Sequence, residues 1–414
     1  MQGRWRRSYL DTFENMSLKI LQIAPRLPYP PDDGGAIGIY NITKQLARRG
    51  HTVRFLTIGR ERELPSPMKE FCSANIAAAS TRHSLFKAGL SICSSMPYTV
   101  YKYRSAVFRN MLDAELRASS YDILHADHLV MAPYALYAKR EYGIPVVLRE
   151  HNLESTFLER YAQNEARVVL RWFAQHELKK MRAFEPEVCR QFDRCIMITN
   201  QDDAALRALS PAVRTTVVPA GVEILPELED DSGGENILFL ASLNWPPNIQ
   251  GFEWFYEHVL PLVLQSHPSA TVTIIGKGGS AKLGTLGHPN IRYVGYVDKI
   301  EPYVREATVA IVPLLAGGGM RIKILELFAH GKAVVSTSVG CEGIEVFAGR
   351  DLFIADTPAE FARSISAVIQ NRDLRRALGQ AGKKLVEKKY SWESVGERLE
   401  TVYREVLSET SGRR

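Results

Sequence analysis

Residues 18–58, "LKILQIAPRLPYPPDDGGAIGIYNITKQLARRGHTVRFLTI", contain the pattern that decides the fold. The apolar run 18–25 has the length of a buried strand, and residues 36–50 follow it with apolar side chains at helical spacing. Gly50 ends this predicted helix, and a second apolar run occupies residues 51–58. A strand, a helix and a strand in this order form a βαβ unit, and such units build parallel sheets. We therefore predict an α/β fold.

The same alternation continues along the chain and then begins again. Apolar runs predict further strands at 121–127, 144–152, 193–200 and 215–222. Residues 223–236 are acidic and rich in Gly and Pro, which is typical of a linker. A strand, a Pro-rich loop, a helix and a strand then recur, and the strands of this second series are predicted at 237–243, 270–278, 291–297, 309–315, 333–339 and 351–356. The restart predicts two Rossmann-like domains rather than one large sheet.

We predict a disordered extension over residues 1–15 and a first domain over 16–222. A linker at 223–236 leads to a second domain at 237–390. Residues 391–414 form a terminal helix that is expected to pack back on the first domain. In parallel α/β sheets, ligands bind at the carboxyl ends of the strands. The loops 26–36 and 316–321 both leave such ends, so we expect the two domains to face each other across a cleft. The stretch 155–192 predicts a pair of helices that Pro186 interrupts.

Length and composition exclude several classes of protein. The 414 residues are 45% hydrophobic and 24% charged, with a formal net charge of +6. This charge is mild for the length, and the sequence shows no basic stripe with interleaved aromatic residues, so we expect no nucleic-acid partner. No apolar run reaches the roughly 18 residues of a membrane-spanning helix. The five cysteines are odd in number and lack metal-ligand spacing, which favours a cytoplasmic protein with free thiols.

A second motif, "GGGMRIKILELFAHGKAVVST" at 317–337, indicates a ligand site. The glycines allow the backbone to approach a ligand closely, and a helix that begins near Met320 would offer unpaired N–H groups to an anion. Arg321 and Lys323 add two cations, which suit a diphosphate. Glu326 lies further along the same helix, where a carboxylate can accept hydrogen bonds from the hydroxyls of a ribose. Phosphates and a diol describe a nucleotide, although a solvated helix start after a glycine loop fits the fragment equally well.

With this motif, the chain resembles the family-4 retaining glycosyltransferases of the two-Rossmann (GT-B) type over nearly its whole length from Met16. In that family the motif usually carries two glutamates separated by seven residues. Glu326 occupies the second position, which holds the nucleotide ribose, whereas Gly318 stands where the first glutamate contacts the donor sugar. The resemblance implies that Gly318, Gly319 and Met320 bind the donor, that the second domain is the donor side and that the first is the acceptor side.

The family's usual Arg and Lys for the diphosphate lie early in the second domain. Here that segment, 241–251, reads "ASLNWPPNIQG" and contains no cation; Ser242, Leu243 and Asn248 stand roughly where the cations are expected. We infer that Arg321 and Lys323 supply the missing positive charge, and we assign both of them a catalytic role.

Two further motifs resemble sites of the family. "DDGG" at 32–35 resembles the glycine loop whose backbone meets the donor phosphate and the acceptor, so Gly34 and Gly35 are assigned to substrate binding; a Pro-Asp-Gly turn is the alternative. "REHNLES" carries His151, which would contact the donor sugar near its anomeric carbon; the alternative is a histidine with a structural role. The loop 125–129 resembles another cleft-facing loop of the family, but its Asp127 and His128 are assigned no role.

The resemblance implies a cytoplasmic hexosyltransferase that moves a sugar from a nucleotide-diphosphate sugar to a sugar or a lipid-linked sugar, with retention, in bacterial polysaccharide or glycolipid assembly. We expect no cofactor and no metal, because Arg321 and Lys323 neutralise the diphosphate. Residues 82–105 mix apolar, aromatic and cationic side chains, which suit a lipid-linked acceptor, peripheral contact with the inner face of the membrane, or packing of an insertion. A nucleotide-sugar epimerase and a non-catalytic nucleotide-sugar binding protein remain alternatives.

Overall fold

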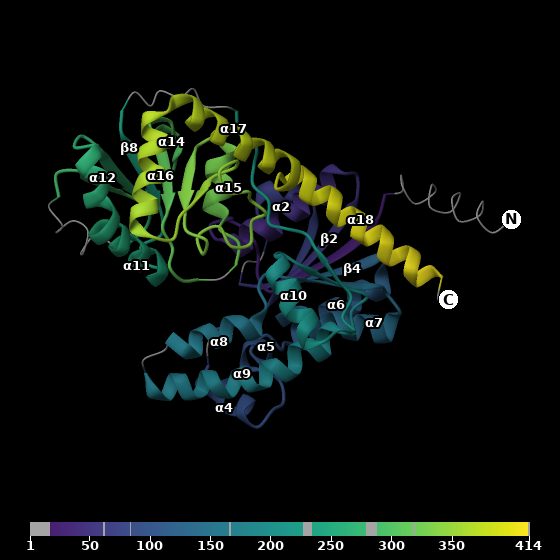
Figure 1. Cartoon of the computed structure of the whole chain (residues 1–414). Helices are drawn as coiled ribbons and strands as arrows, with labels where there is room; N and C mark the ends of the chain where they lie inside the picture. The colour runs from purple at the N-terminus through teal and green to yellow at the C-terminus, as the bar shows by residue number, and fades with distance from the viewer. Residues whose placement is uncertain are drawn as a thin grey trace. The chain divides into compact units, whose positions relative to one another are not determined.

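The computed structural model describes residues 17–60, 63–82, 84–164, 167–226, 234–278, 288–317 and 319–412 (Figure 1). The predicted extension 1–15, residues 227–233 of the predicted linker and Gly318 lie outside the described residues. The chain divides into two compact units: unit 1 comprises Met1–Pro219 and Val395–Arg414, and unit 2 comprises Ala220–Ser394. The change of unit thus precedes the predicted domain end at residue 222, because Val222 forms a parallel bridge with Ser391 inside unit 2.

In the described part of unit 1, parallel strands form a seven-stranded sheet in the order β3-β2-β1-β4-β5-β6-β7. These strands are β1 Lys19–Ala24, β2 Thr52–Gly59, β3 Ser73–Ala78, β4 Ile123–Asp127, β5 Val146–Glu150, β6 Arg194–Met197 and β7 Thr215–Val217. The accompanying helices are α2 Gly34–Arg48, α3 Ser66–Lys69, α4 Leu85–Ile92, α5 Tyr98–Tyr101, α6 Ala106–Ala118, η1 Leu129–Met131, α7 Ala132–Tyr142, α8 Glu154–Asn164, α9 Val168–Cys189 and α10 Asn200–Leu209.

The described part of unit 2 contains a six-stranded parallel sheet in the order β10-β9-β8-β11-β12-β13. Its strands are β8 Asn236–Leu240, β9 Thr271–Ile275, β10 Ile291–Gly295, β11 Val309–Val312, β12 Val334–Ser336 and β13 Phe353–Ile354. Its helices are α11 Pro246–Trp254, the π-helical turn η2 Phe255–Val259, α12 Leu260–Ser266, α14 Glu301–Glu306, α15 Ile322–Ala329, α16 Pro358–Gln370 and α17 Arg372–Lys389. Two parallel sheets with helices confirm the predicted α/β class.

The central strands are buried, and so are the polar side chains that they carry. All residues of β4 and β5 are buried, and every residue of β1 after Lys19 is buried. β1, β4 and β5 lie side by side, with Ile20 opposite Ile123 and Asp127 opposite Arg149. Their carboxyl ends therefore share one edge of the sheet, and the loops that follow them are brought together there.

The last helix, α18 (Trp392–Ser411), joins unit 1 from Val395 onward. Its Glu400 accepts a hydrogen bond from Nε of Arg49, at the end of α2. The fully buried hydroxyl of Tyr403 contacts Nδ1 of His125 in β4. The terminal helix thus completes the interior of unit 1.

Two elements differ from the sequence-based expectations. β3 was not predicted, because its sequence "SANIAA" is short, rich in alanine and only partly buried. α9 does not stop at Pro186 but continues to Cys189, so the predicted interruption is wrong. The proline removes one backbone hydrogen bond near the helix end, and the buried side chains of Glu185 and Val188 keep the last turn in place.

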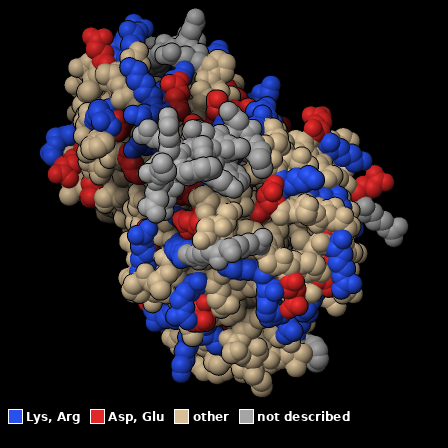
Figure 2. Space-filling view, turned by 90° about the vertical axis from the view of Figure 1, so that its right-hand side faces the viewer, with Lys and Arg blue, Asp and Glu red and all other residues tan. Residues whose placement is uncertain are grey.

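Lys and Arg are interspersed with Asp and Glu on the face shown in Figure 2, which agrees with the mild net charge of +6. Within the described part of the chain, no helix combines the length and the apolar character that crossing a bilayer requires.

Candidate functional site

The loop between β11 and α15 in unit 2 places the first group of candidate residues. β8 and β11 are neighbours in the sheet, so the loops that leave their carboxyl ends meet at one edge. The backbone φ is +137° at Gly317 and +77° at Gly319, and glycine adopts such values without strain. A Cβ atom at Gly317 would lie 2.5 Å from Nη2 of Arg321 and 3.0 Å from the Trp245 ring, so glycine leaves room for both side chains.

The helix of this motif begins slightly later than expected. Arg321 is the N-cap of α15, whereas the sequence predicted a start near Met320 with both cations in the first turn. Lys323 does lie in the first turn. The half-buried side chain of Met320 packs against the core of unit 2 and so anchors the loop.

Arg321 is held at the carboxyl edge by contacts from two loops. Its guanidinium is buried, and Nη1 donates a hydrogen bond to the backbone oxygen of Gly319 at 2.9 Å. The guanidinium carbon lies 5.5 Å from the ring centroid of Trp245, which follows β8, in the range of a cation–π contact. The cation is therefore fixed beside the segment 241–251.

Lys323 reaches the same segment. Its Nζ donates a hydrogen bond to Oδ1 of Asn248 at 3.0 Å, and Nδ2 of the buried Asn248 donates to the backbone oxygen of Ser242 at 2.6 Å. The structure thus brings Lys323 against Asn248, one of the positions where the sequence lacked an expected cation. Burial, together with the nearby charge of Arg321, lowers the pKa of Lys323 to about 8.

The lowered pKa of Lys323 makes ligand affinity depend on pH. A bound diphosphate stabilises the ammonium form, so binding is strongest below the pKa of the free protein and weakens as Lys323 loses its proton above it. We expect the affinity for a nucleoside diphosphate, measured by calorimetry, to fall about tenfold from pH 7 to pH 9, because the pKa lies near 8. Lys323→Arg keeps the charge throughout this range and should flatten the profile. An equal pH dependence in the arginine variant would assign the titration to another group.

Glu326 lies on the same helix, three residues beyond Lys323. Its side chain is half-buried, and burial raises the pKa of the carboxyl while Lys323 opposes that rise. A carboxylate in this place remains open to accept hydrogen bonds from a ligand held at the start of α15. The arrangement in unit 2 therefore combines two cations, a helix start and one acceptor along a single edge.

The second group of candidate residues lies at the carboxyl edge of the unit 1 sheet. Asp33 caps α2: its Oδ1 accepts hydrogen bonds from the backbone N–H groups of Gly35 and Ala36, each at 3.0 Å, and it pairs with Arg26. This cap explains why α2 begins at Gly34, earlier than predicted. A Cβ atom at Gly35 would lie 3.6 Å from Nδ1 of His151. The structure thus places Gly35 beside His151, two residues that the sequence identified separately.

His151 is held by a buried ion pair. Nη1 of Arg149 lies 3.1 Å from Nε2 of His151 and 3.5 Å from Oδ1 of Asp127, and the same carboxylate oxygen lies 3.4 Å from Nε2. Nε2 of Gln22 donates to the other oxygen of Asp127 at 2.6 Å. A guanidinium can only donate and a carboxylate can only accept, so the two contacts of Nε2 make opposite demands. The contact with Arg149 is the shorter, which favours the neutral tautomer of His151 that is protonated at Nδ1, the nitrogen facing Gly35.

The charges of this group favour the neutral form of His151. Burial lowers the pKa of His151, and Arg149 lowers it further, although Asp127 opposes both effects. Burial acts to raise the pKa of Asp127, but the neighbouring His125, His151 and Arg149 hold it well below its usual range. The site therefore presents a neutral imidazole whose Nδ1–H can donate to a ligand hydroxyl.

His128 extends the group beyond His151. Its φ is +80°, an uncommon value for a residue other than glycine, and its ring centroid lies 5.5 Å from that of His151. Its Nε2 lies 3.4 Å from Oε1 of Glu154. Burial and the proximity of His151 lower the pKa of His128 to about 3, while burial and Glu185 raise the pKa of Glu154 to about 7.

Asp127 and His128 were noted from the sequence without an assigned role. Gln22, Arg149 and Glu154 were not predicted to belong to the site. The sequence does contain a signal for Gln22 and Arg149. Gln22 and Arg149 are polar side chains inside otherwise apolar strands, and such residues need a buried partner. Among the described residues, no group of three or more His, Cys, Asp or Glu side chains is arranged to hold a metal ion.

Comparisons with known proteins agree with the division of the chain into two units. The family model "Glycosyltransferase Family 4" matches residues 33–224, and the model "Glycosyl transferases group 1" matches residues 234–371. The chain is also similar to an uncharacterized 44.6 kDa protein in the cps region of Klebsiella pneumoniae. The two are 22% identical over 364 residues, which cover 84% of this chain and 90% of that protein.

Two solved structures share the fold. Sucrose-phosphate synthase from Thermosynechococcus elongatus superposes with a TM-score of 0.69 at 17% identity, covering 94% of this chain and 100% of that one. HepE from Anabaena, in complex with UDP and glucose, superposes with a TM-score of 0.62 at 12% identity, covering 93% of this chain and 99% of that one. These likenesses confirm the architecture of two Rossmann-like domains that the restart of the strand pattern predicted.

Proposed function

Because the chain belongs to the family-4 glycosyltransferases with the GT-B fold, we propose that it transfers a hexose from a nucleoside-diphosphate sugar to a sugar or lipid-linked sugar. The observation that carries this proposal is the contact of Lys323 with Asn248 beside Arg321. Two cations meet at the strand edge where this chain lacks the usual basic residues, and a diphosphate is the ligand that such a pair suits. The similarity to a protein of a cps region and to HepE, crystallised with UDP and glucose, supports polysaccharide or glycolipid assembly with a nucleotide sugar as donor.

The proposed reaction breaks the bond between the anomeric carbon and the diphosphate oxygen. Arg321, Lys323 and the start of α15 stabilise the charge that develops on the leaving diphosphate. The acceptor oxygen forms a bond on the face that the diphosphate leaves, and its proton passes to the departing phosphate oxygen. This front-face course gives retention and requires no protein nucleophile. The Nδ1–H of His151 hydrogen-bonds a sugar hydroxyl while positive charge builds up on the ring.

The proposal is tested by turnover. Nucleotide sugars are first ranked by the rise in unfolding temperature that each produces, and the best is then incubated with candidate acceptors. Acceptor-dependent release of nucleoside diphosphate is the expected result. Conversion of the donor to an epimer without an acceptor would instead identify an epimerase. Binding without any turnover, across a broad acceptor panel, would identify a nucleotide-sugar binding protein.

Glu326 is expected to bind the ribose diol of the donor. We expect Glu326→Gln to weaken binding of a ribonucleoside diphosphate by about tenfold, since a hydrogen bond to a charged group contributes roughly 1.5–3 kcal/mol. The 2′-deoxy analogue lacks one of the two hydroxyls and should lose less, so the preference for ribose narrows in the variant. Calorimetry with both ligands measures this ratio, and Glu387→Gln on α17 is the matched control. An equal loss of affinity for both ligands would show that Glu326 does not bind the ribose diol.

We also expect transfer without a divalent metal, because Arg321 and Lys323 supply the positive charge that a metal would bring to the diphosphate. Activity should persist in excess chelator and should not rise when magnesium or manganese is added. A chelator saturated with its metal controls for direct effects of the compound. Complete loss in free chelator, reversed by either metal, would contradict this expectation.

A further inference from the structure

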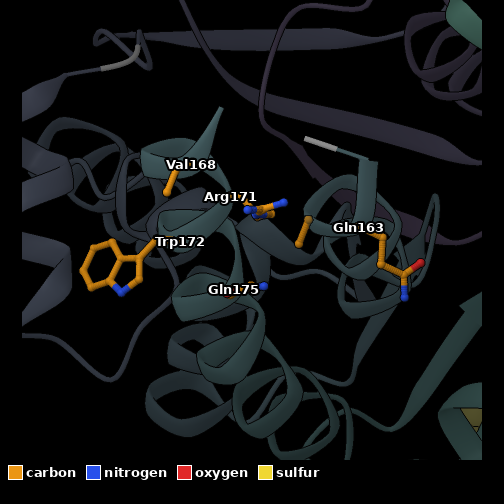
Figure 3. Close-up of a pocket in the computed structure, with 6 residues that line it drawn as sticks. Gln163, Val168, Arg171, Trp172 and Gln175 are labelled. Carbon is orange, nitrogen blue, oxygen red and sulfur yellow. The ribbon is translucent and has the colours of Figure 1, made fainter. Parts of the chain in front are cut away.

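The pair of helices α8 and α9 in unit 1 ends in an exposed apolar surface. On α9, the exposed fractions are 69% for Val168, 76% for Val169 and 56% for Trp172, and Phe157 and Tyr161 on α8 are exposed as well. We call these five residues the docking tip. In Figure 3 the indole of Trp172 points away from the helix pair, whereas Arg171 points toward α8. A shallow pocket of about 470 Å³ lies here, lined by Ala162, Gln163, Val168, Arg171, Trp172 and Gln175.

The docking tip belongs to a pair of helices that is firmly built into unit 1. Other side chains of the two helices are buried, at Leu158 of α8 and at Ala174 and Met181 of α9. An ion pair between Arg182 and Glu159 at 2.8 Å links the helices. Large apolar side chains at the end of a well-anchored helix pair indicate an interaction surface rather than a poorly packed core.

Cations accompany the apolar side chains of the docking tip. Arg160, Arg167 and Arg171 are exposed and alternate with them in the sequence. The carboxylate of Glu159 is engaged by Arg182, so positive charge predominates among the described residues around the tip.

A third helix, α4, lies beside α9 and exposes further apolar side chains. Lys180 of α9 donates a hydrogen bond from Nζ to the backbone oxygen of Ser91 at 2.8 Å, which fixes the end of α4 beside α9. Leu90 and Ile92 of α4 are exposed too. The surface is thus made by more than one helix, with apolar and cationic side chains together.

We propose that the docking tip binds the surface of an anionic lipid bilayer. Valine and tryptophan side chains enter the boundary between headgroups and acyl chains, and the arginines pair with lipid phosphates. A second copy of this chain fits the surface less well, since a symmetric contact would set like charges of the two copies against each other. This inference is independent of the transfer reaction and locates a membrane contact on a defined part of unit 1.

Two variants of the full chain test the proposal by sedimentation with vesicles. One variant combines Val168→Ser, Val169→Ser and Trp172→Ser; the other combines Arg160→Gln, Arg167→Gln and Arg171→Gln. The natural chain should bind vesicles of phosphatidylcholine containing phosphatidylglycerol and should bind pure phosphatidylcholine weakly. The arginine variant should lose roughly 100-fold in partitioning, because each surface cation contributes about fivefold, and the apolar variant should lose binding to a similar extent.

Matched controls separate the docking tip from general surface effects. Val107→Ser on α6 removes an exposed apolar side chain elsewhere in unit 1, and the triple variant Arg363→Gln, Arg372→Gln and Arg376→Gln removes three exposed arginines of unit 2. Both controls should bind like the natural chain. Brominated lipid should also quench tryptophan fluorescence in the natural chain but not in Trp172→Phe.

Three results would overturn the proposal: equal partitioning of natural chain and tip variants, equal binding to neutral and anionic vesicles, or quenching that persists in Trp172→Phe. A dimer in light scattering that the apolar variant converts to a monomer, without lipid, would assign the surface to contact between copies of the chain.

Discussion

Replacing both Arg321 and Lys323 with Ala should weaken binding of a nucleoside diphosphate by roughly 3–6 kcal/mol, since each charge-assisted hydrogen bond contributes roughly 1.5–3 kcal/mol. This corresponds to a loss of affinity on the order of 10²–10⁴-fold. Both side chains are fixed before any ligand arrives, Arg321 by Gly319 and Trp245 and Lys323 by Asn248, so little ordering of these groups opposes binding. Isothermal titration calorimetry near pH 7 measures the effect, because Lys323 is charged there.

The control for this double variant is Arg376→Ala with Lys384→Ala, which removes the same charges from exposed positions on α17. It should bind nucleoside diphosphate with the affinity of the natural chain. Thermal unfolding of both double variants checks that unit 2 remains folded. Unchanged affinity in a folded Arg321→Ala, Lys323→Ala protein would show that the diphosphate does not bind at this edge of the sheet.

His151→Ala should lower kcat on the order of 10²–10³-fold while leaving the affinity for plain nucleoside diphosphate nearly unchanged. The magnitude is that of losing one preorganised hydrogen-bond donor at the reacting centre. His151 belongs to unit 1, whereas the cations proposed for the diphosphate belong to unit 2, so the two measurements probe different groups. Its contact is expected to strengthen as charge develops on the sugar, so kcat should fall more than KM rises.

The control for the histidine variant is His258→Ala, which removes an exposed histidine of unit 2. Arg149 keeps its contact with Asp127 when His151 is absent, so the buried ion pair retains a partner. Normal turnover in His151→Ala would return this residue to a structural role. Loss of nucleoside-diphosphate binding in a folded variant would contradict its assignment to the sugar end of the donor.

Much of the fold could be predicted because its strands are continuous apolar runs of the length that a parallel sheet buries. The runs 18–25 and 237–243 coincide with β1 and β8 to within one residue at the start, and both strands end earlier because the last residues of each run belong to loops. β3 was not predicted because this alanine-rich edge strand is not a continuous run of large apolar residues. The observed start of α2, Gly34, differs from the predicted start at residue 36. The hydrogen bonds that Asp33 accepts determine where the helix begins, and the apolar pattern does not reveal them.

The candidate site was only partly predictable. The missing cation near Asn248 suggested that Lys323 acts there, because a diphosphate needs charge and the glycine motif offered it. The contacts of His151 with Arg149 and Asp127 could not be predicted in the same way. They depend on the register that sets Asp127 opposite Arg149 in neighbouring strands, and register follows from tertiary packing rather than from either strand alone.

The contact between Tyr403 and His125 bears on how the protein is made. A ribosome adds roughly 5–20 residues per second, so synthesis of Ala220–Ser394 separates the first part of unit 1 from its last helix by on the order of 10 s. During that interval the nascent first unit lacks the side chain that contacts His125, while the residues of unit 2 are synthesised. The unit that starts first is thus finished last. A stop codon between residues 395 and 403 would leave all residues of the second unit attached to a first unit with an open interior.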